Sequence, residues 1–398
     1  MNTAEFPVPD PQAPRTFSEY TTARVGGTAG RWIVVESEYD AIDLLQNHPL
    51  PTEAERAAGA DTLLVLGGGS NLLVADSGFS GTVLHLAFTG ISAAPVHAQR
   101  RDAQGREVSD GPGTDGVEVT IAAGHNWDAA VAWTVERGLV GLETLSGIPG
   151  AAGATPVQNV GAYGTDVSHT LLDARVWDRA EDELVTLTNA ELEFSYRSSL
   201  LKRTTVAGSP RYVVLSVRFR LTHQPGPALS SPVRYAELAR SLNLAPDAPE
   251  AERRASLAAV RETVLRLRAG KGMVLDATDH DTWSTGSFFT NPIVSQEVAA
   301  RLPEDAPTFP AGTDAHGHGL IKLSAAWLID RSGCAKGFGA ELVAGRASLS
   351  TKHTLAVTNR GQATTEDLLT VARAAREKVI ATFGITLDPE PVLIGCRL

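Results

Sequence analysis

The sequence predicts a mixed α/β or α+β protein, because strand-like and helix-like segments alternate along it. Residues 213–221 alternate apolar and polar side chains, which is the strongest strand signal in the chain. Residues 365–383 place apolar side chains on one face of a helix that ends at Gly384. With 398 residues the chain is too long for one ordinary core, so two or three domains are expected.

The first part of the chain predicts strands at residues 32–35, 63–66 and 82–86 and a helix at 37–46. Residues 1–16 are rich in proline and predict an extended, disordered arm. Residues 95–116 are mostly polar, with many glycines and aspartates, and predict a surface loop or hairpin tip. We assign no function to either segment.

The middle of the chain predicts a strand at 117–121 and a helix at 127–137, with Asn126 as its cap and Gly138 as its stop. Residues 223–250, rich in proline, serine and alanine, predict a linker with a loop. An amphipathic helix is expected at 252–268, and a last strand is expected to run to about residue 395.

Composition and charge narrow the classes of partner and compartment. The formal net charge of -11 disfavours nucleic acid and anionic membranes as partners. The two cysteines, Cys334 and Cys396, provide no disulfide framework and no metal-binding spacing. The chain has no membrane-spanning apolar stretch and no signal-peptide pattern at its start, so a soluble cytoplasmic protein is expected.

A glycine-rich loop, Gly67-Gly68-Gly69-Ser70-Asn71, follows the apolar strand at 63–66. Three successive glycines let the backbone approach a bulky anion with several N–H groups, and Ser70 and Asn71 add side-chain donors. The loop is not a Walker motif, because no Gly-Lys-Ser/Thr follows, and its spacing is not that of the dinucleotide fingerprint. Taken alone, the loop fits a phosphate cradle and a tight hairpin equally well.

A second unusual stretch, residues 145–164, contains five glycines and no charged side chain. A surface linker would be more polar, and a core helix would not contain so much glycine and proline. Such backbone suits close wrapping around a flat, extended ligand, and we prefer this interpretation to a buried structural loop. Two backbone-rich loops, one in each part of the chain, would suit a long two-ended cofactor such as a flavin dinucleotide.

Eight segments resemble, in the same order, those of the UDP-N-acetylenolpyruvoylglucosamine reductase family of bacterial cell-wall synthesis. They span nearly the whole chain: YTTARVGG (20–27), LGGGSNLLV (66–74), SGIPGAAGATPVQNVGAYG (146–164), YRSSLLK (196–202), GSFFTNP (286–292), IKLSAAWLID (321–330), KGF (336–338) and LDPEPVLIG (387–395). The resemblance implies an α+β fold with a two-lobed FAD-binding unit of the vanillyl-alcohol-oxidase-like type and an α/β substrate-binding domain.

The resemblance also implies the reaction and its cofactors. NADPH would reduce a non-covalently bound FAD, which would then reduce the enolpyruvyl double bond of the UDP-sugar to give UDP-N-acetylmuramate. The partners would be the UDP-sugar and NADPH, without nucleic acid or membrane, and a monomer is the expected form. The family branch implied is the one that closes a tyrosine-bearing loop over the substrate.

The domain boundaries that follow from this resemblance divide the chain after residue 16. We expect a first FAD-binding lobe at 17–90, to which a C-terminal strand at 385–398 returns, and a second lobe at 91–225. The substrate-binding domain is then expected at 226–384.

Three residues match the family's catalytic positions: Ser287 as proton donor, Arg197 as catalytic arginine and Glu390 as catalytic glutamate. The reaction needs a proton at one alkene carbon while charge develops beside the substrate carboxylate. Arg197 would clamp that carboxylate, and Glu390 would assist proton delivery, with a raised pKa if buried. Each has a plainer alternative: a turn-capping hydroxyl, a surface salt bridge and an exposed turn charge.

The remaining candidates are binding residues. For FAD we expect the backbone and side chains of two loops: Gly67, Gly68, Gly69, Ser70, Asn71, Ser146, Gly147, Ile148, Pro149, Gly150, Gly153, Ala154 and Gly161. For the UDP-sugar the resemblance implies side chains near its sugar and diphosphate: Tyr196, Tyr235, Lys271, Asn291 and His353, with help from Arg268. Lys271 has an alternative role as a helix C-terminal charge.

Some positions depart from the family's pattern. Phe309 stands where some members carry a tyrosine that reaches the substrate phosphate, and phenylalanine has no hydroxyl for that contact. His353 or Lys352 would replace a glutamine of other members. His316 and His318 have no third ligand nearby in the sequence, so no metal site is predicted.

Two other functions remain as alternatives. A flavin-dependent oxidase of the same fold would reoxidise in air and often binds flavin covalently, but the two cofactor loops contain no histidine or cysteine for such a link. A non-catalytic UDP-sugar-binding protein would be favoured by loss of Arg197, Ser287 or Glu390, and all three are present.

Overall fold

The computed structural model describes residues 15–57, 62–96, 100–101, 107–108, 116–223, 228–245 and 248–398. Most of the predicted arm, residues 1–14, and most of the predicted surface loop at 95–116 therefore lie outside the described residues. Thr16 is the N-cap of α1 (Phe17–Tyr20), the first helix of the described residues.

The chain forms two compact units, which we describe separately. Unit 1 consists of Met1–Gly30, Gly69–Ser80 and Gly270–Leu398, and unit 2 consists of Arg31–Gly68 and Gly81–Ala269. The expected domain boundaries at residues 90 and 225 do not coincide with these units, because the chain passes from one unit to the other at residues 30, 68, 80 and 269.

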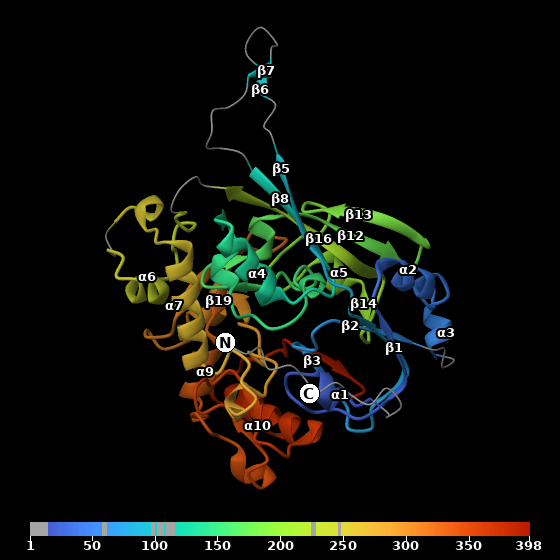
Figure 1. The fold of residues 1–398 in the computed structure, drawn as a ribbon. Helices are drawn as coiled ribbons and strands as arrows, with labels where there is room; N and C mark the ends of the chain where they lie inside the picture. The colour runs from blue at the N-terminus through green and yellow to red at the C-terminus, as the bar shows by residue number, and fades with distance from the viewer. Residues whose placement is uncertain are drawn as a thin grey trace. The chain divides into compact units, whose positions relative to one another are not determined.

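Unit 2 is built mainly of strands (Figure 1). These are β1 (Ala29–Val35), β2 (Leu63–Leu66), β4 (Phe79–Leu86), β5 (Ile91–Val96), β6 (Arg100–Arg101), β7 (Glu107–Val108), β8 (Gly116–Ala122), β9 (Leu139–Val140), β10 (Gly161–Ala162), β11 (Thr165–Asp166), β12 (Leu171–Asp178), β13 (Glu183–Thr188), β14 (Thr205–Val206), β15 (Ser209–Pro210) and β16 (Tyr212–His223). Its α-helices are α2 (Glu38–Gln46), α3 (Glu53–Ala57), α4 (Trp127–Glu136), α5 (Leu200–Arg203), α6 (Ala236–Ser241) and α7 (Leu257–Gly270).

The larger sheet of unit 2 has the strand order β13-β12-β16-β8-β5, with β9 paired to β16, and all of these pairs are antiparallel. Strand β16 is central because its alternating apolar side chains are buried, as the sequence predicts: Val213, Leu215, Val217, Phe219 and Leu221. Trp127 of α4 packs against Phe219, with ring centroids 5.7 Å apart. A smaller sheet, β1-β4-β2, contains the parallel pair β2 and β4.

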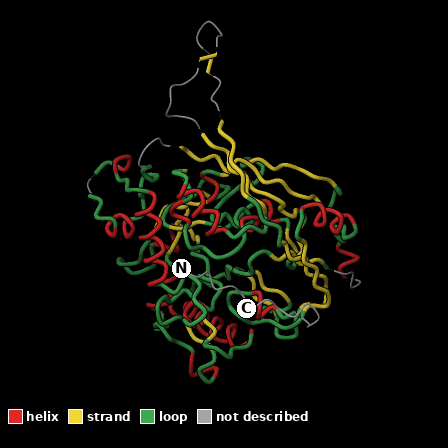
Figure 2. The backbone as a smooth tube through the Cα atoms, viewed as in Figure 1, coloured by secondary structure: helices red, strands yellow, loops and turns green. Residues whose placement is uncertain are grey.

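Unit 1 is assembled around the long helix α10 (Thr365–Phe383), shown in red in Figure 2 with the other helices. Its other elements are β3 (Leu72–Val74), β17 (Ile293–Ser295), α8 (Gln296–Ala299), β18 (Thr308–Thr313), β19 (Gly319–Leu323), α9 (Ala325–Arg331), β20 (Ala347–Leu349), β21 (Val357–Asn359) and β22 (Val392–Ile394). The predicted limits of α10 are confirmed, and Gly384 ends the helix in a left-handed conformation with φ of 66°. Leu368, Val371, Ala375 and Val379 of α10 are fully buried.

The last strand of the chain returns to its first part. Strand β22 pairs in parallel with β3, with Val392 opposite Leu72 and Ile394 opposite Val74. Hydrogen bonds from the N–H of Val392 to Asn71 and from the N–H of Ala75 to Ile394 extend this pairing at 3.0 and 2.8 Å.

The structure differs from the sequence-based expectations at residues 223–268. The segment 223–250 contains helix α6 in addition to loops, and the predicted helix at 252–268 begins only at Leu257. The N–H of Ala259 donates to the Ser256 hydroxyl, which explains the later start, because a serine in this position caps a helix. No helix within the described ranges is long and apolar enough to cross a membrane.

Candidate active site

Ser287 and Glu390 lie on neighbouring backbone segments of unit 1. The N–H of Phe288 donates to Leu355 at 2.7 Å, and the N–H of Glu390 donates to the carbonyl oxygen of Phe288 at 2.8 Å. The N–H of Thr290 continues this pairing to the carbonyl oxygen two residues before Glu390, at 3.0 Å. The backbone that carries Ser287 therefore runs beside the backbone that carries Glu390.

The Ser287 hydroxyl is partly exposed and has no hydrogen-bond partner among the described residues. The turn before it is capped by a different serine, since the N–H of Gly286 donates to the Ser284 hydroxyl at 3.1 Å. Phe288 and Phe289, which follow, are buried with ring centroids 5.1 Å apart. The alternative of a turn-capping role thus belongs to Ser284, and the Ser287 hydroxyl is left available for another partner.

Asn71 joins the glycine-rich loop to the Glu390 segment within unit 1. Its side-chain amide donates to the carbonyl oxygen of Glu390 at 3.3 Å, and its own carbonyl oxygen accepts the N–H of Val392. The predicted cofactor loop and a predicted catalytic residue are therefore held together through one asparagine.

The glycine-rich loop has the properties of an anion cradle. Within the described residues, the N–H groups of Gly68, Gly69 and Ser70 donate to no protein acceptor. Gly69 has φ of 58°, and a Cβ atom there would lie 1.9 Å from the carbonyl oxygen of Tyr20. In unit 2, a Cβ atom on Gly68 would lie 2.5 Å from Cα of Gly150. Only glycine fits these positions, and the unbonded N–H groups suit the diphosphate of FAD.

The second predicted cofactor segment, residues 146–154 of unit 2, is held mainly by backbone hydrogen bonds. Gly153 packs so closely on Ala123 that a Cβ atom would lie 2.5 Å from the Ala123 Cβ. In this segment of described residues, the N–H groups of Ile148 and Gly150 donate to no protein acceptor. The N–H and hydroxyl of Ser146, by contrast, are both used within the chain, on the carbonyl oxygen of Glu143. The segment therefore offers FAD backbone donors rather than the Ser146 hydroxyl.

Asp128 holds the first residues of this segment in place. It accepts the N–H of Gly147 at 2.6 Å and two hydrogen bonds from Arg261, at 2.6 and 2.8 Å. Burial by itself raises the pKa of Asp128, but these hydrogen bonds outweigh it and hold the pKa below its ordinary value. The sequence contained no signal for this residue, which follows the predicted helix cap by two positions.

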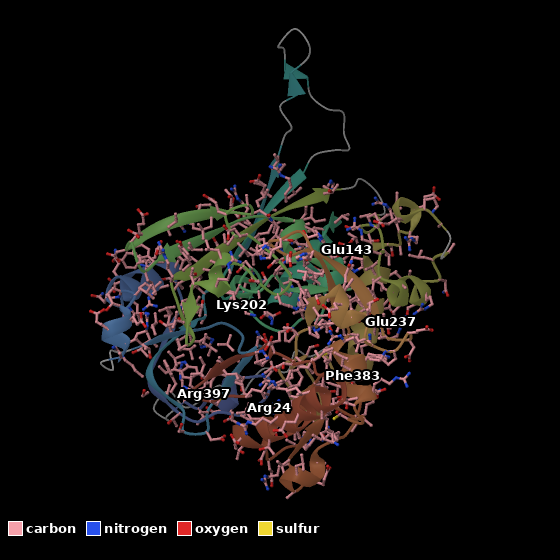
Figure 3. All side chains as sticks on the ribbon, turned by 180° about the vertical axis from the view of Figure 1, so that it is seen from behind. Arg24, Glu143, Lys202, Glu237, Phe383 and Arg397 are labelled. Atoms are coloured by element: carbon pink, nitrogen blue, oxygen red, sulfur yellow. The ribbon has the colours of Figure 1, made fainter. Side chains whose placement is uncertain are left out.

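Arg197 is held against the other end of the small-residue stretch in unit 2. Its Nη1 donates to the carbonyl oxygen of Asn159 at 3.3 Å and its Nη2 to that of Gly161 at 3.1 Å. Its backbone adopts a left-handed conformation with φ of 53°, an uncommon choice for arginine. Lys202, labelled in Figure 3, donates to the Arg197 carbonyl oxygen at 3.2 Å.

Two aromatic residues and a second arginine lie near Arg197 in unit 2. Tyr163 and Tyr235 pack edge to face, with ring centroids 5.4 Å apart. Burial raises the pKa of Tyr163 to about 12, so its hydroxyl keeps its proton. Burial lowers the pKa of Arg268 to about 10. The charges of Tyr163 and Asp128 act to raise this pKa, and the nearby Arg197 lowers it slightly. Tyr163, which stands in the GAYG motif, was not singled out from the sequence.

The predicted substrate residues fall in both units. Tyr196 and Tyr235 belong to unit 2, where they are 38% and 43% exposed. Lys271, directly after α7, and Asn291 belong to unit 1, where Asn291 accepts the N–H of Ala325 at 2.9 Å.

His353 of unit 1 sits in a turn that is fixed by a buried carboxylate. Its N–H donates to the Ser350 hydroxyl, which in turn donates to Asp281 at 2.9 Å. Asp281 also accepts the hydroxyl and N–H of Thr351, at 2.5 and 2.8 Å, and Nη1 of Arg360 at 2.8 Å. Burial by itself raises the pKa of Asp281, but the hydrogen bonds from Thr351 and Ser350 lower it below its ordinary value.

Comparisons with known proteins give independent support. The family model "FAD binding domain" matches residues 55–188, and the model "UDP-N-acetylenolpyruvoylglucosamine reductase, C-terminal domain" matches residues 277–394. Curated proteins named UDP-N-acetylenolpyruvoylglucosamine reductase from Streptomyces avermitilis and Streptomyces coelicolor are 49% and 48% identical to this chain. Each match covers 95% of this chain, and the matches cover 93% and 88% of those proteins.

A solved structure of a protein with this name, from Thermus caldophilus, shares the fold with a TM-score of 0.58. It is 24% identical, and the match covers 96% of this chain and 98% of that one.

The match to the FAD binding domain and the relatives named reductase show that the chain is an FAD-dependent oxidoreductase. Within that class, the chain belongs to the UDP-N-acetylenolpyruvoylglucosamine reductase family. The predicted family, fold class and FAD cofactor are confirmed.

Proposed function

We propose that this chain is an NADPH-dependent reductase that converts UDP-N-acetylglucosamine enolpyruvate to UDP-N-acetylmuramate in peptidoglycan precursor synthesis. The observation that carries the proposal is the backbone pairing of Glu390 with Phe288, which sets a carboxyl group beside the segment of the unpartnered Ser287 hydroxyl. A reaction that must deliver one proton to an alkene carbon needs a proton donor and a group that supports it.

Each predicted residue then has a role in the proposed reaction. When bound, FAD supplies the hydride that is added to the alkene. Ser287 gives its proton to the other alkene carbon, and Glu390 assists this proton delivery. Arg197 spreads the charge that develops beside the substrate carboxylate, since its planar guanidinium is already oriented by two carbonyl oxygens.

Binding residues are proposed from the predicted positions, supported by the backbone contacts within each unit. The free N–H groups of Gly68, Gly69 and Ser70 would hold the diphosphate of FAD, and those of Ile148 and Gly150 would support the rest of the cofactor. We assign the UDP-sugar to the predicted set of Tyr196, Tyr235, Lys271, Asn291 and His353, to which Tyr163 and Arg268 are added. A protonated Tyr163 can donate a hydrogen bond, and Arg268 retains its charge at neutral pH.

The experiment that tests the function separates the two half-reactions. The purified protein should be yellow, and NADPH oxidation should depend on the enolpyruvyl sugar. Ser287→Ala should leave flavin reduction by NADPH intact and slow flavin reoxidation by the sugar at least about 100-fold, since a positioned acid typically contributes that much. Stopped-flow absorbance of the flavin measures both rates.

A matched control is Ser295→Ala in the same unit, because Ser295 caps α8 and has no place in the proposed reaction. It should change both rates by less than a few fold. Equal losses of both half-reactions in Ser287→Ala would contradict the proton-donor role. Rapid reoxidation by air without the sugar would instead favour the oxidase alternative.

A further inference from the structure

Thr22 is a buried residue of the YTTARVGG segment that the proposed reaction does not use. It is 5% exposed, and its hydroxyl donates to the carbonyl oxygen of Ser284 at 2.6 Å. The carbonyl oxygen of Ser70 lies 3.3 Å from the same hydroxyl, and the Thr22 N–H donates to the carbonyl oxygen of Gly69 at 3.1 Å. All of these residues belong to unit 1, although Thr22 and Ser284 are 262 positions apart.

These contacts orient two peptide groups of the glycine-rich loop. In a planar trans peptide the C=O and the following N–H point in opposite directions. Because the carbonyl groups of Gly69 and Ser70 are turned toward Thr22, the N–H groups of Ser70 and Asn71 are turned away from it. Thr22 thereby selects the orientation in which the loop presents its N–H groups to an anion.

The same hydroxyl holds the segment that leads into the proposed proton donor. Ser284 lies three residues before Ser287, and Gly286 between them has φ of 77°, so this turn has a specific conformation. The 2.6 Å bond to the Ser284 carbonyl oxygen is shorter than the 3.3 Å contact with Ser70 and is the main hydrogen bond of the Thr22 hydroxyl. Arg24, labelled in Figure 3, adds a second contact between these segments, with its guanidinium 4.0 Å from the Trp283 ring centroid.

We propose that Thr22 is a positioning residue that couples the cofactor loop to the proton-donating segment. Its N–H holds the Gly69 carbonyl oxygen of the cofactor loop. Its hydroxyl contacts the Ser70 carbonyl oxygen of the same loop and fixes the turn that presents Ser287. The proposal rests on the proposed roles of the loop and of Ser287, and it predicts that loss of this hydroxyl weakens FAD binding and slows proton delivery together.

The test compares two adjacent threonines. Thr22→Val keeps the shape of the side chain and removes its hydroxyl. Thr21→Val is the matched control, because Thr21 is fully buried and its hydroxyl donates to Val25 at 3.1 Å, within its own segment. Both variants lose one buried hydrogen bond, so a general loss of stability should be similar in both. Thr22→Ser keeps the hydroxyl and should restore wild-type behaviour.

Two readouts are needed, one of which does not involve turnover. The Kd of the apoprotein for FAD, from flavin fluorescence, should rise about tenfold in Thr22→Val and stay within about twofold in Thr21→Val and Thr22→Ser. At saturating FAD, reoxidation of the reduced flavin by the enolpyruvyl sugar should slow about tenfold in Thr22→Val, while reduction by NADPH should keep its wild-type rate.

Equal FAD affinities in Thr22→Val and Thr21→Val would overturn the proposal. The proposal would also be overturned if Thr22→Ser bound FAD as weakly as Thr22→Val. If Thr22→Val does not fold, Thr22→Ala introduces no new atoms and takes its place in every comparison. The FAD measurement stands even if the sugar is not the substrate, so failure of the coupling and failure of the proposed function give different results.

Discussion

Single residues in this protein often act through backbone groups rather than through other side chains. Arg197 donates to two carbonyl oxygens, Asn71 donates to the carbonyl oxygen of Glu390, and Thr22 donates to Ser284. Such contacts fix the direction of a peptide group, which is what a site that binds its cofactor by N–H groups needs. The hydroxyl of Ser287, by contrast, has no hydrogen-bond partner among the described residues.

Asp367 is the residue whose contribution to stability can be stated most directly. It accepts hydrogen bonds from Arg346 at 2.8 and 2.6 Å and from the N–H of Thr364, the cap residue of α10. The hydrogen bonds from Arg346, followed by those from Thr364, lower its pKa from 3.8 to about 2, although burial opposes the shift. Its side chain is 8% exposed, so solvent screens these contacts little.

Because the pKa of Asp367 is lower in the folded state, the Asp367 carboxylate stabilises the fold above about pH 4. This contribution to the free energy of unfolding is lost as the pH falls toward 2. A shift of this size corresponds to about 2 kcal/mol. Asp367→Asn should therefore lower the free energy of unfolding by about 2 kcal/mol at pH 7, measured by urea unfolding. Its difference from the wild type should shrink between pH 4 and pH 2.

The neighbouring Glu366 provides the control for this prediction. Its side chain is 62% exposed and pairs with Arg373 at the surface. Glu366→Gln should change the free energy of unfolding by less than about 1 kcal/mol, as is usual for an exposed pair. If Asp367→Asn lowers the free energy of unfolding by the same amount at pH 2 and pH 7, the charge of Asp367 is not the cause of the lower stability.

At the scale of elements, the glycine-rich loop depends on a backbone conformation that only glycine can adopt. Gly69→Ala would combine a strained φ of 58° with a Cβ atom 1.9 Å from the Tyr20 carbonyl oxygen, so the loop must move. We expect the Kd for FAD to rise by at least about tenfold, because displaced N–H groups no longer converge on the diphosphate. Flavin content after purification and fluorescence titration with FAD measure this effect.

Gly333→Ala separates backbone strain from loss of the cradle. Gly333 has a similar φ of 84°, and a Cβ atom there would have no neighbour within 4 Å. Gly333→Ala should lower the free energy of unfolding by about 1 kcal/mol and leave the Kd for FAD unchanged. An equally weak FAD affinity in both variants would mean that lower stability, rather than the loop, accounts for the loss.

Elements with strong local signals were predicted well from the sequence. The limits of β2 and α10 agree with the predictions at Leu63–Leu66 and Thr365–Phe383, because an apolar run before glycines and a capped amphipathic pattern are local features. Helix α6 was missed because its surroundings are rich in proline and serine, whereas its Leu238 is buried by contacts with residues distant in sequence.

Only those residues of the candidate site that lie in recognisable motifs could be predicted from the sequence. Ser287, Arg197 and Glu390 stand in recognisable segments, but the pairing of Glu390 with Phe288 joins residues that are 102 positions apart. Thr22 has an identical neighbour in Thr21, and no local pattern distinguishes the hydroxyl that stays within its segment from the one that reaches Ser284. Such distinctions depend on tertiary contacts.

At the scale of the whole molecule, the order of the chain does not follow the order of its units. Unit 1 draws on the beginning, a short middle segment and the last third of the chain. The middle segment, Gly69–Ser80, contains both the cofactor-loop residues from Gly69 onward and strand β3. The parallel pairing of β3 with β22 therefore ties the cofactor loop to the C-terminal end of the chain.

This pairing predicts that a few residues at the C-terminus control the cofactor loop. A chain that ends at Pro391 would keep Glu390 but lose β22, including the hydrogen bonds from Val392 to Asn71 and from Ala75 to Ile394. The Asn71 carbonyl oxygen would then lose its hydrogen bond from Val392. We therefore expect the FAD content to fall at least about tenfold, together with a lower melting temperature for unit 1. A chain that ends at Gly395 keeps the strand and should retain most of its FAD. If the two truncated chains bind FAD equally well, β22 does not support the loop, and other contacts, such as those of Thr22, must hold it.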